Sequence, residues 1–405
     1  MTARQVTLSQ EAAVHLTSAQ AAPPRVVAVV SPYYPPKVGG VEHYAARVAR
    51  AVADSPGLEP VVITTRPSGL RTLDGVEDGV RVIRLGVWIR LSNTPLSPVW
   101  PLQLRRWLRR TGAEVVNAHA PVPGLGDLAV AMSGKRPAVL TYHAGSMHKG
   151  LPGSGAADRL IGFYERRVLP RVLRRARVLV PVSPVSLASG QAHSVQITPG
   201  VDLARFTPGE PASTRRRTVV YLGRMDRSSA WKGVDVLLRA FAELAADLPD
   251  VRLRLIGGGD ARADQLALAG RLGIADRVDA PGESTGPELV HELRTAALLV
   301  LPSLTESESF GMALVEAMAC GTPVVGSAVG GIPHVVTDGA NGLLVPPGDA
   351  PALAAACRRI LTDPRLADRL AEAGLARVQQ DFSWPVLTDR YLQLFRSLIG
   401  VSESA

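Results

Sequence analysis

Two glutamates, Glu308 and Glu316, lie in the most informative stretch of the sequence, residues 301–325, which reads LPSLTESESFGMALVEAMACGTPVV. An apolar run there predicts a strand ending at Pro302, and a helix is predicted to begin near Phe310. Backbone amides at a helix N-terminus are unpaired and carry partial positive charge, so this junction is a natural seat for a phosphate. The residues expected to line that seat are Ser309, Phe310, Gly311, Met312 and Ala313.

The two glutamates would play different parts around a phosphate-bearing ligand. Glu308 lies just before the helix and could reach the group that the phosphate carries. Glu316 lies two turns further on, in a segment apolar enough to be buried, where an ionised carboxylate is costly unless it has partners. The vicinal hydroxyls of a ribose would supply them. A glutamate at a helix start or on a solvated face is commoner, so neither residue alone establishes a site.

Two cations of the second half are predicted to meet at one edge of a sheet. Arg224 ends the strand-like run TVVYLGR, and Lys232 begins the amphipathic pattern WKGVDVLLRAFAEL. At the carboxyl edge of a parallel sheet each could pair with a diphosphate, although either alone would be an ordinary surface cation. Only four of the 45 basic residues are lysines, so a lysine beside a glycine is weak evidence that a compact point charge is needed.

A glycine loop follows the first predicted strand, RVVAVV at 25–30, and leads into a helix that begins near Val41. Gly39 and Gly40 could bring the backbone close to a ligand, with a helix N-terminus behind them, although two glycines before a helix are often a plain turn. The polar residues beside this loop that could contact an acceptor are Lys37, Glu42 and His43.

Apolar runs continue to alternate with helical patterns, which predicts a parallel, doubly wound sheet. Further strands are expected at 60–65, 80–85, 113–119, 138–143 and 177–183. Such sheets bind ligands beyond the carboxyl ends of their strands. His119, in NAHAP, and His143, in LTYHAG, fall at such ends, although a histidine there is more often a structural residue. For His119 the structural role is preferred, and lining the acceptor cleft is the alternative.

At 405 residues the chain is long enough for two domains of about 200 residues each. We expect a disordered tail at 1–24, a first domain at 25–200, a Pro- and Gly-rich linker at 201–217, a second domain at 218–383 and a last helix at 384–399. No apolar run approaches the length of a membrane span, and residues 1–24 lack the apolar core of a signal peptide, which favours a cytoplasmic protein. The two cysteines have no metal spacing and are expected to be reduced core thiols.

The formal net charge of +9 favours an acidic partner. Arginines gather at 101–110 and 163–178, where each predicted helix has apolar residues on its other side. The ordinary interpretation is that the arginines face the solvent while the apolar side of each helix packs on the core. The more specific hypothesis is that the arginines bind anionic lipid head groups. Aromatic residues make up only 4% of the chain and are not interleaved with the arginines, which argues against nucleic-acid binding.

The stretch 301–325 resembles the signature of the family-4 retaining glycosyltransferases, in which two glutamates separated by seven residues precede A-M-A-C-G-T-P-V-V. The resemblance extends from about Arg25 to the end of the chain. It implies the GT-B type of α/β fold, with two doubly wound, parallel-sheet, Rossmann-like domains facing a central cleft. The first domain would bind the acceptor, the second the nucleotide sugar, and the last helix would cross back to the first domain.

The resemblance also implies roles for individual residues. The first glutamate, Glu308, would contact the donor sugar, and the second, Glu316, the ribose hydroxyls. Gly39 and Gly40 would lie over the donor phosphates and the acceptor, and Gly282 would lie near the nucleobase. His143 would lie close to the donor sugar and the two cations would bind the diphosphate, so the expected catalytic residues are His143, Arg224, Lys232 and Glu308.

The sequence departs from the family at three places. Relatives commonly have Asn before Gly-Val-Asp, where this chain has Pro199. The spacing from Pro-Ser would favour Glu306 as the first glutamate, whereas the Phe-Gly that follows favours Glu308. The loop MDRSSAW before Lys232 is longer than in many relatives.

The expected activity is a metal-independent, retaining hexosyltransferase that moves a sugar from a UDP- or GDP-linked donor to an acceptor hydroxyl in glycan, glycolipid or natural-product biosynthesis. No Asp-x-Asp occurs, and neither a cofactor nor an essential metal is expected. The acceptor stays open among a lipid-linked sugar, an inositol, an antibiotic aglycone and a polysaccharide, and peripheral contact with the inner face of a membrane is a further hypothesis. The alternatives are a nucleotide-sugar epimerase or phosphorylase on the same fold and a non-catalytic nucleotide-sugar-binding protein.

Overall fold

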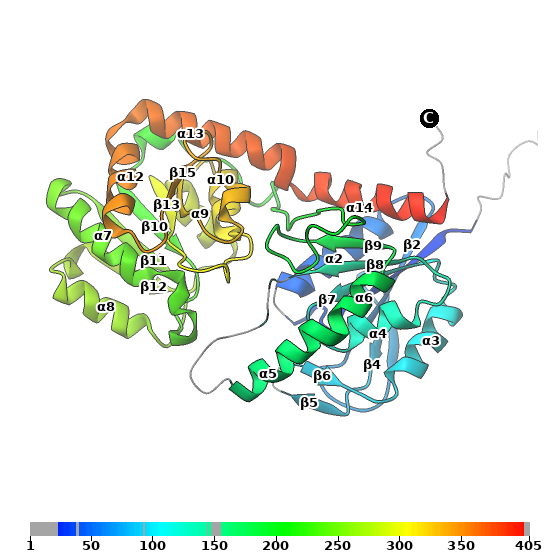
Figure 1. Ribbon diagram of the computed structural model, residues 1–405. Coiled ribbons are helices and arrows are strands. Elements are labelled where there is room, and N and C mark those ends of the chain that lie inside the picture. The colour runs from blue at the N-terminus through cyan, green and yellow to red at the C-terminus, as the bar shows by residue number, and fades with distance from the viewer. Residues whose placement is uncertain are drawn as a thin grey trace, which may run out of the picture.

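The structure, a computed structural model, describes residues 23–37, 40–91, 94–143, 145, 147 and 155–400. Every strand expected in the first half is present in one seven-stranded sheet (Figure 1). Its order is β3-β4-β2-β1-β7-β8-β9, and all neighbours are parallel except β3 and β4. The strands are β1 (Arg25–Val30), β2 (Leu58–Thr65), β3 (Leu73–Glu77), β4 (Val80–Leu85), β7 (Val115–Ala120), β8 (Ala138–Tyr142) and β9 (Val178–Pro181).

Helices cover both faces of this sheet because successive side chains of its central strands point to opposite faces. On β1, Ala28 and Val30 pack in a core with α3 (Trp100–Arg110), α4 (Leu125–Met132) and α6 (Leu169–Arg175). Val27 and Val29 pack on the other face with α2 (Gly40–Ala53) and α14 (Trp384–Ile399). Side chains on both faces are therefore apolar, as the β-branched runs of the sequence predict.

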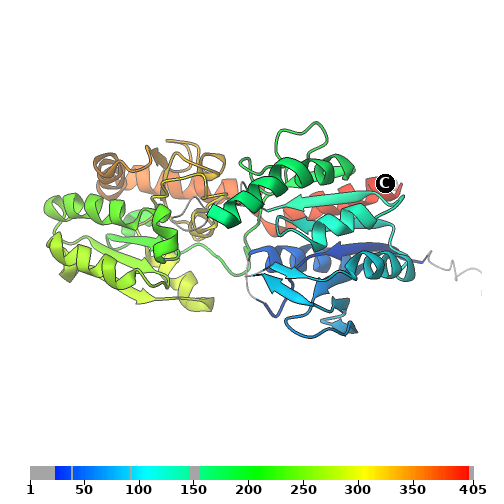
Figure 2. The ribbon, with the colours of Figure 1, turned by 60° about the horizontal axis from the view of Figure 1, so that its bottom comes forward.

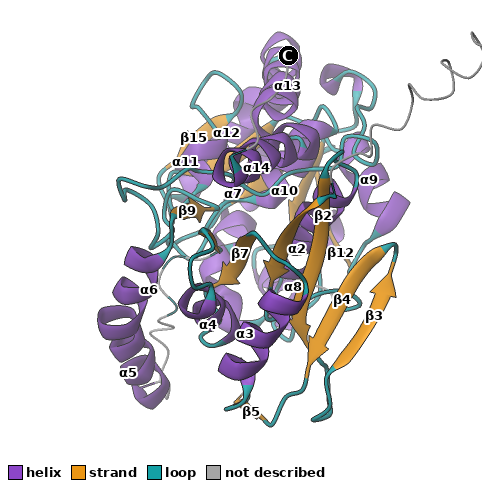
Figure 3. Ribbon diagram, turned by 90° about the vertical axis from the view of Figure 1, so that its right-hand side faces the viewer, coloured by secondary structure: helices purple, strands orange, loops and turns teal. Residues whose placement is uncertain are grey.

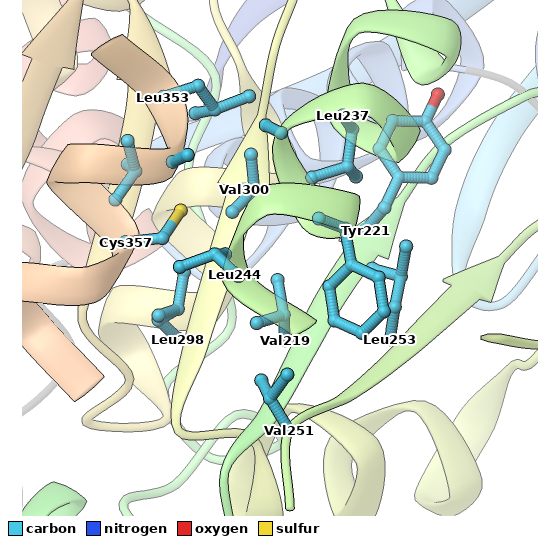
Figure 4. Close-up of a cluster of buried hydrophobic side chains, with 14 of the residues drawn as sticks. Val219, Tyr221, Leu237, Leu244, Val251, Leu253, Leu298, Val300, Leu353 and Cys357 are labelled. Carbon is cyan, nitrogen blue, oxygen red and sulfur yellow. The ribbon is translucent and has the colours of Figure 1, made fainter. Parts of the chain in front are cut away.

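The second half forms a six-stranded, fully parallel sheet of order β12-β11-β10-β13-β14-β15. One face packs on α7 (Val234–Asp247) and α12 (Ala350–Thr362), with Val219, Leu237 and Cys357 among the side chains of the core (Figure 4). The strands are β10 (Thr218–Leu222), β11 (Arg252–Ile256), β12 (Val278–Gly282), β13 (Leu298–Leu301), β14 (Val324–Ser327) and β15 (Leu343–Val345). The other helices of this half are α8 (Arg262–Arg271), α9 (Gly286–Thr295), α10 (Met312–Ala319), α11 (Ile332–Val335) and α13 (Pro364–Arg377).

The chain passes between the two sheets twice, and the two passages are hydrogen-bonded to each other. Val201 N donates to Phe382 O at 2.8 Å, and Trp384 N donates to Val201 O at 3.2 Å. Helix α14 then runs along α2 of the first domain, although it follows the second domain in sequence (Figures 1 and 2). Each domain is Rossmann-like, and together they have the GT-B architecture that the sequence predicts.

Several elements were not expected from the sequence. The strand β3 lies at the edge of the sheet, beside β4 (Figure 3). It is exposed along its whole length, and its sequence LDGVE lacks the apolar pattern that predicts a strand. The hairpin strands β5 (Ile89–Leu91) and β6 (Thr94–Leu96) were also missed, as were the π-helices at Tyr164–Val168 and Val378–Phe382. The expected tail at 1–24 lies almost wholly outside the described residues, and among those that are described no helix is long and apolar enough to cross a bilayer.

Candidate active site between the domains

A cavity of about 460 Å³ lies between the two domains, at the carboxyl edges of both sheets. The first domain contributes Gly40, Val41, Tyr44, His143 and Val182, and the segment after β9 contributes Pro199. The second contributes Leu222, Lys232, Leu289, Leu301, Glu308, Ser309, Phe310, Gly311, Met312, Ala313 and Glu316. A larger cavity of about 600 Å³ lies beside Thr218, at the opposite edge of the second sheet. We assign the site to the inter-domain cavity because doubly wound sheets bind ligands at the carboxyl edge.

Glu308 is held at this cavity by two side chains. It is 7% exposed, and its Oε2 accepts hydrogen bonds from Lys232 Nζ at 2.6 Å and from Ser303 Oγ at 3.0 Å. Lys232 Nζ also lies 4.6 Å from the centroid of the Trp231 ring. Glu306 is exposed and does not line the cavity. Of the two candidates for the first glutamate, Glu308 and not Glu306 therefore lies at the cavity. Lys232 reaches the cavity despite the long loop before it.

Two glycines that the sequence analysis missed position the backbone of Glu308. Gly331 N donates to Glu308 O at 2.8 Å. A Cβ atom at Gly331 would lie 2.0 Å from Ser309 O, and one at Gly330 would lie 2.2 Å from Glu308 O. The loop after β14 can thus pack on the loop before α10 only if both residues lack a side chain. The dipeptide Gly-Gly before Ile-Pro was the available signal, although it is equally typical of a plain turn.

Glu316 lines the cavity from the second turn of α10. Burial raises the pKa of its carboxyl to about 7, and the charge of Arg205 opposes this shift. Among the described residues no side chain or backbone group hydrogen-bonds to the Glu316 carboxylate. The cavity therefore contains a carboxyl group with unused hydrogen-bonding capacity, at the position where the sequence predicts contact with a diol.

His143 lies on the opposite wall of the cavity and is hydrogen-bonded from behind. Its Nε2 is 2.9 Å from Nδ1 of His119, and His119 Nε2 is 2.9 Å from Asn117 Oδ1. Burial lowers the pKa of His143 to about 3 and lowers the pKa of His119 well below its usual value, with the neighbouring His143 adding to the shift at His119. Both rings are therefore neutral at physiological pH. His119 is fully buried, which agrees with the preferred structural role, so the alternative that it lines an acceptor cleft is wrong.

Other residues expected at the donor site lie outside the cavity. The Arg224 side chain is 74% exposed, and its Nε donates to Asp226 Oδ2 at 2.7 Å. It lines a separate cavity of about 310 Å³, so Arg224 and Lys232 do not converge in this structure as expected. The two cations do not converge because the Arg224 guanidinium pairs with the carboxylate of Asp226, two residues further along the chain. Gly282 ends β12 without lining the inter-domain cavity, and Gly39 lies outside the described residues.

A further cavity of about 370 Å³ lies in the first domain, beyond the ends of β1, β2 and β4. Lys37 contributes to it, with Nζ 3.2 Å from the centroid of the Tyr33 ring and 3.6 Å from Glu42 Oε1. Its lining residues are Pro32, Tyr33, Tyr34, Pro36, Lys37, Thr65, Arg66, Pro67, Arg84 and Arg90. Glu42 is buried and ion-paired with Lys37, and the exposed His43 lines neither this cavity nor the inter-domain one.

Comparison with known proteins agrees with this architecture. The family described as glycosyl transferases group 1 matches residues 206–377, and glycosyltransferase family 4 matches residues 38–205. The chain is 34% identical over 394 residues to D-inositol 3-phosphate glycosyltransferase 1 of Catenulispora acidiphila, covering 89% of this chain and 91% of the relative. It is 29% identical over 383 residues to the phosphatidyl-myo-inositol mannosyltransferase of Mycolicibacterium smegmatis, covering 92% and 94% of the two chains.

The solved structure of sucrose-phosphate synthase from Thermosynechococcus elongatus is similar with a TM-score of 0.72. The match covers 93% of this chain and 100% of that one, at 26% identity. The first domain therefore matches one glycosyltransferase family model and the second domain matches another, and relatives match the chain over both domains. The chain belongs to glycosyltransferase family 4 and is a glycosyltransferase of the GT-B fold.

Proposed function

We propose that this glycosyltransferase moves a hexose from a nucleoside diphosphate sugar to an acceptor hydroxyl, with retention of the anomeric configuration and without an essential metal ion. The observation that carries the proposal is the inter-domain cavity that combines the Lys232–Glu308 pair, the unpartnered Glu316 and the N-terminus of α10. The departing diphosphate develops negative charge, which a cation and helix amides can stabilise without a metal.

The proposed roles follow from the position of each group in the cavity. The Glu316 carboxylate would accept hydrogen bonds from the ribose hydroxyls, and the amides at 310–313 with Lys232 would hold the diphosphate. Glu308 would hydrogen-bond to the sugar. Because Lys232 and Ser303 already occupy one of its carboxylate oxygens, Glu308 is a poor nucleophile. We therefore favour substitution on the same face of the sugar, assisted by the departing phosphate.

We further propose that the acceptor carries a phosphate, which the first-domain cavity would bind. The four cations Lys37, Arg66, Arg84 and Arg90 line this cavity, and two carboxylates are ion-paired with them, Glu42 with Lys37 and Glu77 with Arg84. The excess of positive charge suits an anionic ligand. The relatives named for inositol phosphate and phosphatidylinositol, together with sucrose-phosphate synthase, support a phosphorylated polyol or its lipid ester as the class of acceptor.

A lipid-linked acceptor would bring the enzyme to an anionic membrane surface. Leu102 on α3 is 73% exposed, and Leu160 and Phe163 on α5 (Gly155–Phe163) are 67% and 57% exposed. Arginines flank these apolar side chains along both basic stretches. Apolar groups beside cations are what binding at a lipid head-group layer requires. We propose that this side of the first domain makes peripheral contact with the cytoplasmic face of a membrane.

Thermal unfolding tests the donor site directly. The protein is melted without metal against UDP, GDP, ADP and their common sugar conjugates, alongside Glu316→Ala and the matched control Glu306→Ala. Ligand bound to the native state raises the unfolding temperature, and the stabilisation grows with the logarithm of the ligand concentration divided by the dissociation constant. We expect one nucleotide to stabilise the wild type and Glu306→Ala but not Glu316→Ala. If none of these ligands stabilises the wild type, the proposal of a UDP-, GDP- or ADP-linked donor is refuted.

A further inference from the structure

A continuous chain of buried hydrogen bonds runs from His143 to the two segments that connect the domains. Beyond His119 and Asn117, Asn117 Nδ2 donates to Thr141 Oγ1 at 3.0 Å, and Thr141 Oγ1 lies 2.9 Å from the Tyr391 hydroxyl of α14. The Tyr391 hydroxyl lies 3.3 Å from that of Tyr44, and Tyr44 donates to Ile197 O at 2.8 Å. All members behind His143 are buried, so none of these groups has water as an alternative partner.

The Asn117 amide fixes the direction of the bonds on the cavity side of this chain. Asn117 Nδ2 donates to Thr141 Oγ1, so Thr141 Oγ1 accepts there and directs its own proton to the Tyr391 hydroxyl. At the far end the Tyr44 hydroxyl donates to Ile197 O at 2.8 Å, with the Tyr391 hydroxyl as a second, more distant acceptor at 3.3 Å. Tyr391 therefore serves as the acceptor of the Thr141 proton.

The same proton count continues to the cavity. Since Asn117 donates through Nδ2, its Oδ1 faces His119 and accepts the proton on His119 Nε2. A neutral imidazole has one N–H and one lone pair, so His119 Nδ1 accepts and His143 Nε2 donates. His143 Nδ1 is thereby left without a proton. The only ring nitrogen of His143 free to meet a ligand is a hydrogen-bond acceptor.

We propose that His119 and Tyr391 are positioning residues that hold His143 as the Nε2–H tautomer, so that His143 Nδ1 accepts a hydrogen bond from a hydroxyl of the donor sugar. The tautomer follows from the hydrogen-bond chain alone, whereas the contact with a sugar hydroxyl rests on the proposed function. Helix α14, which carries Tyr391, is the segment by which the chain returns from the second domain to the first. Recognition of the sugar would thus depend on the position of this helix against the first domain.

Imidazole nitrogen chemical shifts test the tautomer without any substrate. The full-length chain has eight histidines, and His143→Gln and His119→Asn identify the two relevant signals after ¹⁵N-histidine labelling. We expect both rings as neutral Nε2–H tautomers, and a His143 protonated on Nδ1 would overturn the proposal. Tyr391→Phe should give His143 a mixture of tautomers, because Thr141 loses the acceptor of its proton and can donate to a reversed Asn117 amide instead. The control Tyr164→Phe removes another buried hydroxyl of the same domain, which bonds to Asp127, and should leave the His143 signal unchanged.

Calorimetry separates positioning of His143 from general damage to the fold. Asn at position 119 places an oxygen near the site of the histidine Nδ1, whereas Leu removes the acceptor. We expect His119→Leu to bind the nucleotide sugar about tenfold more weakly, as for one lost hydrogen bond, with unchanged affinity for the free nucleotide. His119→Asn should bind both ligands nearly as the wild type does. The probes are UDP with UDP-glucose and GDP with GDP-mannose.

The two tests fail in different ways. Equal weakening of nucleotide and nucleotide sugar in His119→Leu would assign His119 a purely structural role and overturn the proposal. Loss of sugar affinity in His119→Asn as large as that in His119→Leu would do the same. A wild type that binds none of the four probes would instead refute the proposed function, while the nitrogen shifts would still decide the tautomer.

Discussion

Replacing Glu316 by glutamine should make the unliganded protein more stable and less able to hold a nucleotide. Burial raises the pKa of the Glu316 carboxyl to about 7 from its ordinary value of 4.5. The folded state therefore binds a proton more tightly than the unfolded state does. The stability that this proton contributes is fully present below about pH 4.5 and is lost as the pH rises through about 7.

The size of the effect follows from the pKa difference. About 2.5 pH units at about 1.4 kcal/mol each give a loss of at most about 3.5 kcal/mol by pH 8, and access of water to the cavity reduces it. Glutamine resembles the protonated carboxyl and has no charge to bury. Glu316→Gln should therefore match the wild type near pH 4.5 and exceed it at pH 8 by about 1–3 kcal/mol, or several degrees in unfolding temperature for a domain of this size.

Thermal unfolding between pH 4.5 and pH 8.5, with and without the nucleotide, measures both sides of this prediction. The wild type should gain more stabilisation from the nucleotide as the pH rises through about 7, because the ionised carboxylate is the stronger acceptor for hydroxyl protons. Glu316→Gln should show little of this pH dependence and a weaker nucleotide effect at every pH. The reasoning is refuted if the variant is less stable than the wild type at pH 8 or keeps its pH dependence. Glu306→Gln, an exposed position, is the control and should change neither quantity.

Three further predictions concern the surroundings of the site. Asp226→Asn releases Arg224 from its ion pair and should tighten nucleoside diphosphate binding in calorimetry by up to about fivefold, about 1 kcal/mol for an exposed pair; an unchanged affinity would mean that Arg224 does not reach the diphosphate. Gly331→Ala should lower the urea-unfolding free energy by about 2–4 kcal/mol, whereas Gly270→Ala, with open space around its Cβ position, should not lower it. Arg90→Ala should raise the KM for a phosphorylated acceptor about tenfold and leave nucleotide affinity unchanged, and an equal effect on the unphosphorylated acceptor would contradict a phosphate contact.

The residues around the start of α10 were found because they are close to one another in the chain. Glu308, Glu316 and the start of α10 belong to one strand–helix junction, so their spacing alone brings them to one cavity. The strands were found because both faces of each parallel sheet are covered, which leaves continuous apolar runs. The exposed β3 has no such pattern and was missed for the same physical reason.

The residues that sequence reasoning misplaced depend on contacts between distant segments or on side-chain conformation. His119 stayed open between a structural role and an acceptor contact because its bond to His143, which follows the neighbouring strand β8, cannot be seen in NAHAP. The position of Arg224 at a strand end was predicted, but its pairing with Asp226 depends on how the side chain turns. Gly330 and Gly331 act on a loop more than twenty residues earlier, which a local pattern does not reveal.

The position of α14 has a consequence for how the protein is made. Its Leu387, Tyr391 and Phe395 complete the apolar core over one face of the first sheet, whose β1 begins at Arg25. A ribosome adds residues at about 5–20 per second, so the first sheet is synthesised many seconds before the helix that covers it. Until then α2 covers that face without α14, and the second domain is complete before the first. The domain that is first in the sequence is therefore the last to finish folding, and a chain cut before Trp384 should depend on chaperones or aggregate.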